Sequence, residues 1–211
     1  MRRPARSILG DTRGGPAAEF ALVLPVMLMF LLGIIDVGRL MWTWNRAEKA
    51  TQMGVRYAVA TEIIPTALAG YSFAASGGIP QGDPIPDTAF GGIQCTSNGT
   101  AATCTCNTST CGPSTLIDDQ TAANTRFANI VARMAAFMPE ITASRVRIDY
   151  GYSGLGYAGD PNGSDVAPLV TVRLRNMTFR PLLLMLFGGS ITLPDFRAAL
   201  TLEDGSGTVS N

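Results

Sequence analysis

An unbroken run of apolar residues near the N-terminus dominates the hydrophobic pattern of this chain. The run extends from Phe20 to Ile35 and contains no polar or charged side chain. As a helix, these sixteen residues would cover about 24 Å at ~1.5 Å per residue. The flanking residues 15–18 and 37–42 extend the segment beyond the ~30 Å hydrocarbon core of a bilayer. The pattern therefore predicts one transmembrane helix, which contains Pro25.

The same helix is expected to continue past the bilayer. Residues 45–60 contain no proline and are rich in helix formers. Small and apolar residues recur there at steps of three and four: Ala47, Ala50, Met53 or Gly54, and Tyr57. Such a stripe is typical of a helix with one buried face. We expect a continuous helix from about residue 16 to about residue 62, with its first half in lipid and its second half carrying a domain.

Residues 62–117 have a different character. They contain five prolines, many glycines, and neither Lys nor Arg. Prolines and glycines at this density exclude long regular elements. The segment is predicted to be a loop-rich insertion held together by its cysteines, and a partly disordered linker is the alternative.

The remainder of the chain alternates between helical and strand patterns. A second helix is expected from Asp118 or Asp119 to about Met138, with an apolar stripe and an aspartate as its N-cap. Residues 145–152 and 169–176 alternate between apolar and charged positions, and residues 191–203 offer one or two more strands. One apolar and one charged face indicate an antiparallel sheet that is covered on one side. The fold class predicted is α+β and pilin-like: a long N-terminal transmembrane helix against a small antiparallel sheet, with a second helix and the disulfide-containing insertion.

A second apolar stretch, Pro181 to Phe187, is too short to cross a membrane. Two placements are open for it. It could be buried in the base of the domain, or it could dip into the membrane surface beside the anchor.

The four cysteines are Cys95, Cys104, Cys106 and Cys111. Their spacing lacks the paired C-x2-C hooks of structural zinc modules. Disulfides in an oxidising space such as a periplasm are expected, with zinc and free thiols as alternatives. Cys104 and Cys106 are too close to pair comfortably with each other, so two of the three connectivities remain open.

Composition restricts the function. The net charge is zero, with 16 basic and 16 acidic residues, which removes the usual electrostatic basis for nucleic-acid binding. Histidine, the commonest general base and catalytic zinc ligand, is absent from the sequence. We therefore expect a protein that is not an enzyme and that has no cofactor, no metal and no nucleic-acid partner.

A motif stands directly before the apolar run, where residues 13–20 are R-G-G-P-A-A-E-F. A cleaved secretory signal would require a small-x-small site soon after the run, and Asp36 to Arg39 do not provide one. An ordinary signal anchor explains the run but gives no role to Glu19 at its start.

Glycine, four residues and then Glu-Phe at the start of an apolar helix is the hallmark of class III prepilins and pseudopilins. With this motif the sequence resembles the TadE-like family of tight-adherence (Flp-type) pilus systems. The resemblance covers about residues 13–58. It includes a proline inside the apolar run, Pro25, and a Gly-x-Ile-Asp-x-Gly-Arg stretch at residues 33–39.

The resemblance implies cleavage by a membrane prepilin peptidase between Gly14 and Gly15. Glu19 would then be the fifth residue of the mature chain, followed by Phe20, and both would serve in assembly. The new amine would lie at the positive end of a helix dipole, where a carboxylate one turn away can neutralise it. Since an isolated charge deep in a bilayer costs about 2.5–3.5 kcal/mol on insertion scales, this pairing would be strongly favoured.

The function expected from the resemblance is that of a minor pseudopilin, a structural or assembly subunit of a Flp-type pilus. Its partners would be the prepilin peptidase, other pilins, the inner-membrane assembly platform and membrane lipid. Four basic residues precede the span, and four follow it closely (Arg39, Arg46, Lys49 and Arg56), so charge does not decide the orientation. The motif and the distal cysteines favour a cytoplasmic N-terminus and a periplasmic domain. The expected divisions are a leader (1–14), the transmembrane and assembly helix (15–62), the insertion (63–117) and the helix-plus-sheet part (118–211).

Two other classes of function are open. The chain could be a bitopic envelope protein whose outer domain binds a ligand without any filament role. It could also be a membrane-anchored enzyme, although its composition gives this little support.

Overall fold

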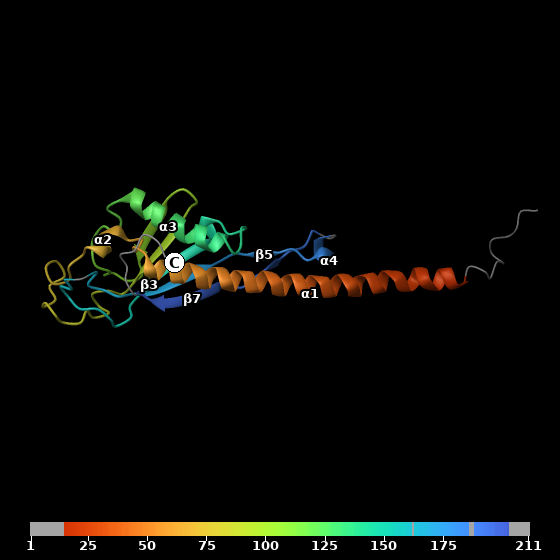
Figure 1. The fold of residues 1–211 in the computed structure, drawn as a ribbon, viewed down its shortest axis with the longest axis horizontal. Helices are drawn as coiled ribbons and strands as arrows, with labels where there is room; N and C mark the ends of the chain where they lie inside the picture. Colours follow the sequence, from red (N-terminus) through yellow and green to blue (C-terminus); the bar gives the residue numbers. More distant parts are fainter. Residues whose placement is uncertain (1–14, 162, 186–187, 203–211) are drawn as a thin grey trace, which may run out of the picture. The chain divides into compact units, whose positions relative to one another are not determined.

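The computed structural model describes residues 15–161, 163–185 and 188–202 (Figure 1). The chain divides into two compact units. One takes in the chain up to Trp42 together with Phe179–Ile191, and the other holds Thr43–Thr178 with the chain from Thr192. Of the two residues at the predicted processing site, Gly15 is described and Gly14 lies outside the described residues.

The first unit contains the start of the long helix α1, Gly15–Ala60, which runs through Pro25 and across the unit boundary. It also contains the short helix α4, Leu182–Met185. Strand β5 (Thr178–Phe179) precedes α4 in the sequence and strand β6 (Ile191–Thr192) follows it. The two strands pair to form a two-stranded sheet. The predicted continuous helix is confirmed, and it ends five residues before Pro65.

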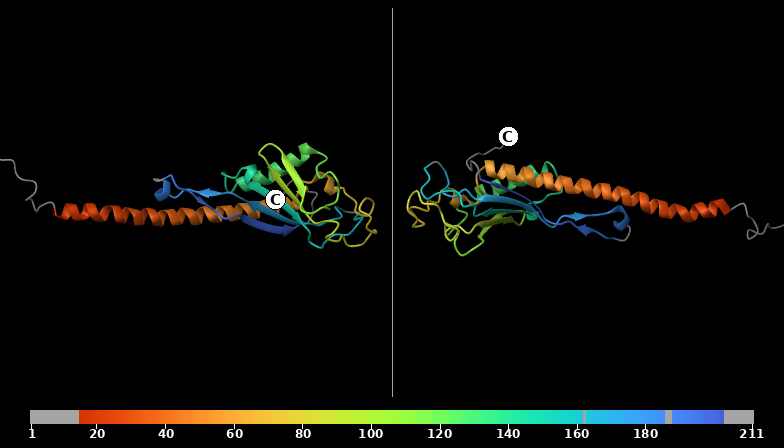
Figure 2. Two further views of the ribbon diagram at one scale, coloured as in Figure 1. Left: turned by 180° about the vertical axis from the view of Figure 1, so that it is seen from behind. Right: turned by 90° about the horizontal axis from the view of Figure 1, so that it is seen from below.

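The second unit is built around an antiparallel sheet, drawn as arrows in Figures 1 and 2. Its five strands lie in the order β2-β1-β3-β4-β7. The strands are β1 (Ile93–Ser97), β2 (Ala102–Cys106), β3 (Val146–Gly151), β4 (Leu169–Leu174) and β7 (Phe196–Thr201). In the centre of the sheet, Ile148 lies opposite Cys95 on one side and opposite Val172 on the other.

The second half of α1 and helix α3 cover the apolar face of the sheet. The predicted stripe on α1 is confirmed, because Ala47 and Ala50 are fully buried and Gly54 is buried as well. A Cβ atom at Gly54 would lie 2.7 Å from Cγ of Met134 on α3 and 3.5 Å from Cγ1 of Val172 on β4. Small side chains at these positions therefore allow the helix backbone to approach the core closely.

The opposite face of the sheet carries charge. Register places Arg147, Arg173 and Arg197 in one row across β3, β4 and β7. Like charges directly opposite one another are unfavourable, and Asp149 offsets them through ion pairs of 2.7 Å with Arg147 and 2.8 Å with Arg173. The sheet is covered on one side, as its alternating pattern predicts.

Helix α3 spans Gln120–Ala135. Its N-cap is Asp119, whose carboxylate accepts a hydrogen bond of 3.0 Å from the backbone N–H of Ala122. Phe127, Ile130 and Met134 form its buried stripe. Both the N-cap aspartate and the stripe agree with the sequence pattern.

The proline-rich segment 62–117 contributes more regular structure than its composition suggests. It holds helix α2, Thr66–Ala69, and the hairpin β1–β2, which joins the central sheet through β3. The hairpin can form because the stretch between Pro86 and Pro113 contains no proline. The rest of the segment is loop, as predicted.

Candidate membrane anchor and assembly site

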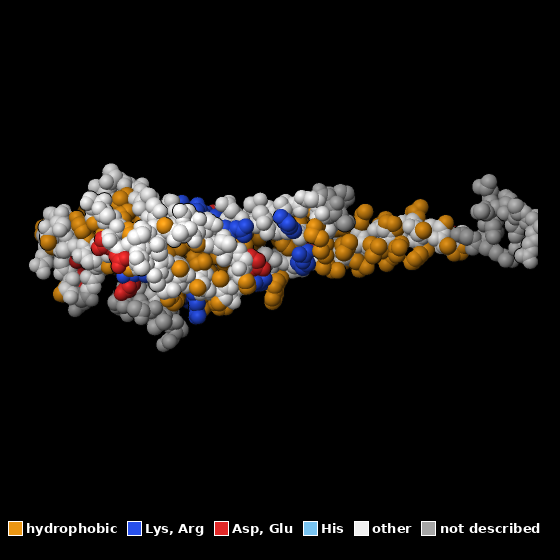
Figure 3. All heavy atoms as spheres, turned by 90° about the horizontal axis from the view of Figure 1, so that it is seen from above, with side chains coloured by type: hydrophobic (Ala, Val, Ile, Leu, Met, Phe, Trp, Pro, Cys, Tyr) orange, Lys and Arg blue, Asp and Glu red, His pale blue; other side chains and the backbone are white. Residues whose placement is uncertain are grey.

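The anchor segment, residues 15–42 of α1, exposes apolar side chains along most of its length, and Figure 3 shows one face of it. Phe20, Phe30 and Ile34 are 63%, 72% and 70% exposed. The most apolar window of α1 has a mean hydropathy of 2.6, and only 6% of it is buried. A core helix of a soluble domain would be mostly buried, so this helix has the length and the surface of a membrane span.

Glu19 and Phe20 lie in the second turn of α1 and are exposed. Glu19 is four residues after Gly15, the first residue of the helix, so the two positions share one helix face. Among the described residues, none donates a hydrogen bond to the Glu19 carboxylate. A carboxylate in this position is available to a group from outside the described chain.

Asp36 marks the other end of the apolar run and is 93% buried, with 7% of its surface exposed. Its Oδ1 accepts hydrogen bonds from the backbone N–H of Leu182 at 2.8 Å and from Nη1 of Arg39 at 3.0 Å. Its Oδ2 accepts a third bond from the N–H of Leu183 at 3.1 Å. A buried carboxylate is tolerated when it is hydrogen-bonded and paired in this way.

Arg39 extends the same contact. Its Nη1 also reaches the carbonyl oxygen of Arg180 at 3.4 Å, and its guanidinium carbon lies 5.4 Å from the ring centre of Phe179. Asp36 and Arg39, three residues apart on the helix, thus form an ion pair of 3.0 Å. Sequence analysis left open that Pro181 to Phe187 lies beside the anchor, but it missed the contact of Asp36 and Arg39 with residues 179–183. The one signal for that contact was an aspartate directly after an apolar run.

The apolar side chains of α4 are not buried. Leu184 and Met185 are 40% and 58% exposed, while Leu182 and Leu183 are half-buried. Burial in the base of the domain, one of the two placements open from the sequence, does not describe these residues. Leu186 and Phe187 lie outside the described residues.

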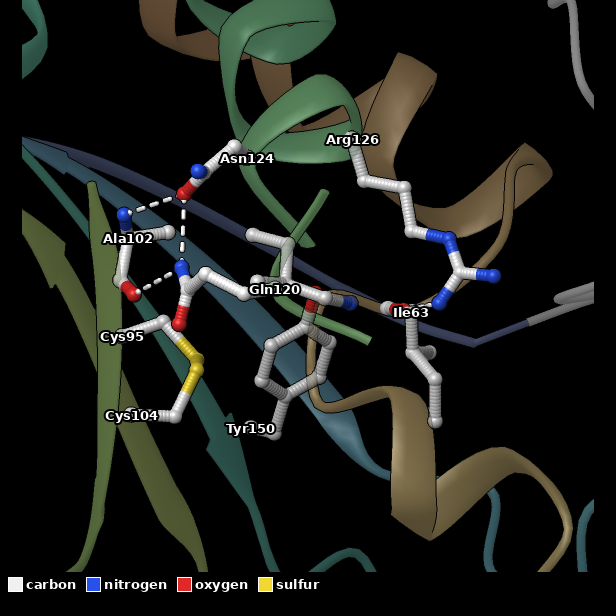
Figure 4. Close-up of a disulfide and its surroundings, with 9 residues drawn as sticks. Ile63, Cys95, Ala102, Cys104, Gln120, Asn124, Arg126 and Tyr150 are labelled. Carbon is white, nitrogen blue, oxygen red and sulfur yellow. Dashed lines mark hydrogen bonds between the residues drawn. A yellow bond between two sulfur atoms is a disulfide. The ribbon is translucent and has the colours of Figure 1, made fainter. Parts of the chain in front are cut away.

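The four cysteines form two disulfides, Cys95–Cys104 and Cys106–Cys111. Cys95 and Cys104 lie directly opposite each other in the β1–β2 hairpin, close to the point where Gln120 and Asn124 of α3 bond to the backbone of Ala102 (Figure 4). This is one of the two connectivities left open by the sequence. The disulfides tie the hairpin and the loop that follows it.

The second unit has a surface hollow beside helix α3. This hollow of about 410 Å³ lies between the end of α1 and α3, and the ion pair of Glu62 with Arg126, 2.7 Å long, borders it. Within residues 15–161, 163–185 and 188–202, no three His, Cys, Asp or Glu side chains lie close enough together to hold a metal ion. The sequence features that point to function are therefore concentrated on the anchor.

Comparison with known protein families gives a match for the N-terminal part of the chain. Residues 14–56 match the model of a family described as TadE-like protein. This stretch holds Glu19, the apolar run and the buried stripe as far as Gly54, and it confirms the resemblance over that part of the chain. No curated protein and no solved structure matches the chain.

Proposed function

We propose that the protein is a minor pseudopilin of a tight-adherence (Flp-type) pilus, anchored in the inner membrane and processed by a prepilin peptidase. One observation carries the proposal. Glu19 lies exposed one turn into a bare apolar helix, and the segment around it matches the TadE-like family.

Processing between Gly14 and Gly15 would place a free amine at the first residue of α1. This amine lies at the positive end of the helix dipole, one turn from the Glu19 carboxylate. The carboxylate can neutralise the amine of its own chain or of a neighbouring subunit. In lipid either pairing removes the cost of two isolated charges, so Glu19 favours insertion of the helix beside another pilin.

The anchor also has a surface groove against which a neighbouring helix could pack. One face of the helix is hollowed into a shallow apolar groove at the small residue Gly33. Small residues at a helix surface let a second helix approach closely in a membrane, where packing drives association. The groove is lined by Val26, Met29, Phe30, Gly33, Ile34 and Val37.

The domain carried by residues 43–178 and 192–202 supports a minor role in the filament. With this domain the chain has 211 residues, far more than the short helical subunit that forms the bulk of a filament of this type. Its two disulfides require an oxidising compartment, which favours a periplasmic domain and a cytoplasmic N-terminus. The assembly platform of the inner membrane and other pilins are the proposed partners.

The test uses a bacterium that carries this chain together with a Flp-type pilus system. Glu19→Gln keeps the size of the side chain and removes its charge. We expect the variant to accumulate in the membrane at the normal level while surface pili, counted by electron microscopy, fall to the number found when the gene is deleted. Glu48→Gln is the matched control, because Glu48 lies on the same helix beyond the apolar run, where its carboxylate accepts a bond of 2.6 Å from Trp44. Normal numbers of pili on cells with Glu19→Gln would contradict the proposed role.

A further inference from the structure

The apolar turn at residues 181–185 is held against the anchor, although Leu182 is 146 residues away from Asp36 in the sequence. Three hydrogen bonds fix it there, two from backbone N–H groups to Asp36 and one from Arg39 to the carbonyl of Arg180. These bonds belong to one compact unit of the molecule. The position of the turn along the anchor is therefore set by the side chains of Asp36 and Arg39.

Asp36 is also the point where the anchor ceases to be apolar. The sixteen residues before it are uncharged, and Arg39 follows three residues later. In a chain that spans a bilayer, the boundary between hydrocarbon and headgroups falls near such a position. The turn is thus attached at the level of the membrane surface.

The side chains of the turn are apolar and exposed, as expected for residues at the membrane surface. Leu184 and Met185 are 40% and 58% exposed, as is Ile191 at 41%. Cationic residues flank the turn: Arg180 precedes it, and Arg39 lies beside it. Apolar side chains next to Arg residues are typical of elements that lie in the interface, with the apolar part in the acyl region and the cation among the phosphates.

We propose that residues 181–185 form a second membrane contact, inserted into the bilayer surface beside the anchor. The occupant of the apolar surface is lipid, because this surface adjoins that of the anchor and is bordered by two arginines. The proposal rests on the anchoring that is part of the proposed function. Attachment at two points would restrict rotation of the anchor about its axis, which a single helix in lipid does not restrict.

Fluorescence quenching in proteoliposomes tests this contact with the full-length protein. Single cysteines at Leu184, Ile34 and Thr100 are labelled with an environment-sensitive fluorophore, while the native cysteines remain in their disulfides. The vesicles contain lipids with a spin label either near the headgroup or deep in the acyl chain. Ile34, 70% exposed on the anchor, reports on the bilayer, and Thr100, exposed in the β1–β2 turn, reports on the aqueous side.

We expect the Leu184 label to lose most of its fluorescence to the shallow spin label, the Ile34 label to be quenched by the deep one, and the Thr100 label to be unaffected. If Ile34 is quenched and Leu184 behaves like Thr100, the second contact is refuted while the anchor stands. If Ile34 is not quenched either, the anchor and with it the proposed function fail. Disulfide cross-linking between Leu184→Cys copies without lipid quenching would place a second subunit on the turn and would also overturn the proposal.

Discussion

Asp36 shows how one side chain can connect distant parts of this chain. Its carboxylate accepts two backbone N–H groups of α4 and pairs with Arg39. Hydrogen bonds to a charged group are strong, and a buried N–H that loses its acceptor leaves a further cost. The fixed position of α4 therefore depends on Asp36 more than on packing, because none of the side chains of α4 is buried.

Asp36→Ala is expected to free the N-terminal turn of α4. Because each bond to the carboxylate is worth about 1.5–3 kcal/mol, amide hydrogen exchange at Leu182 and Leu183 should accelerate by roughly tenfold or more. Hydrogen exchange measured by mass spectrometry in detergent micelles gives these rates. Asp87→Ala removes an exposed carboxylate elsewhere and should leave them unchanged; unchanged rates in Asp36→Ala itself would show that other contacts hold the turn.

Tyr150 is the largest fully buried side chain of the second unit. Its hydroxyl oxygen accepts a hydrogen bond of 3.1 Å from the backbone N–H of Ile64, just after the end of α1. Burial raises the pKa of the Tyr150 phenol well above its ordinary value of 10.0. The folded protein therefore keeps a proton that the unfolded chain loses, and the free energy of unfolding falls as the pH rises above about 10.

Two effects follow for Tyr150→Phe. At neutral pH the variant should lose about 1–3 kcal/mol of stability, because the N–H of Ile64 is left without its acceptor. Between about pH 9 and about pH 11 its stability should decline less steeply than that of the unmodified protein. Denaturant titrations followed by tryptophan fluorescence measure both effects. Trp44 reports on the fold because its ring centre lies 4.9 Å from that of Phe196, in an edge-to-face arrangement. Tyr152→Phe, at a 43% exposed position, is the control, and equal pH slopes for the two proteins would contradict the argument.

At the scale of elements, the β1–β2 hairpin links the proline-rich segment to the sheet. Its register places Cys95 opposite Cys104, and this leaves Cys106 to pair with Cys111. Closing loops of this size stabilises a folded chain by roughly 2–3 kcal/mol per disulfide, chiefly by restricting the unfolded state.

The pairing can be tested with one substitution. Cys104→Ser should free the thiol of Cys95, whereas the alternative pairing of Cys104 with Cys111 would free Cys111. Both candidates are buried, so the free thiol is alkylated after denaturation without reductant and located by tandem mass spectrometry. Cys106→Ser is the complementary variant and should free Cys111; a label on Cys95 in this variant would refute the observed pairing.

The elements differ in how far the sequence predicts them. The long N-terminal helix, the stripe on α1, helix α3 and strands β3 and β4 follow from patterns among neighbouring residues, and the structure confirms these elements. The pairing of the cysteines depends on the register of a hairpin in a proline-rich segment, where no hydrophobic pattern defines the strands. The contact of Asp36 with Leu182 joins positions 146 residues apart, and no local pattern carries that information.

At the scale of the whole molecule, orientation and processing decide the function. Four basic residues lie before the span and four lie within the helix that continues after it, up to Arg56, so the positive-inside rule, which counts residues near the ends of a span, gives no preference. The disulfides are the independent argument that the second unit lies in the periplasm.

Orientation can be measured with Thr100→Cys in cells whose outer membrane has been made permeable. A maleimide that does not cross the inner membrane should label this exposed position without lysis. A cysteine introduced at Ser7, in the leader proposed to be cytoplasmic, should react only after lysis when processing is blocked by Gly14→Ala. The reverse pattern would contradict the proposed topology.

The most direct test of the central claim is the N-terminus of the mature protein. The chain is expressed with an active prepilin peptidase, with a catalytically inactive one, and as Gly14→Ala, and intact mass spectrometry reads the first residue. We predict a chain that begins at Gly15 with the active peptidase and remains uncut in the other two cases. A chain that still begins at Met1, beside a peptidase that cleaves a control pilin in the same cells, would show that the glycine and Glu19 do not form a processing site and that the protein is an ordinary membrane-anchored one.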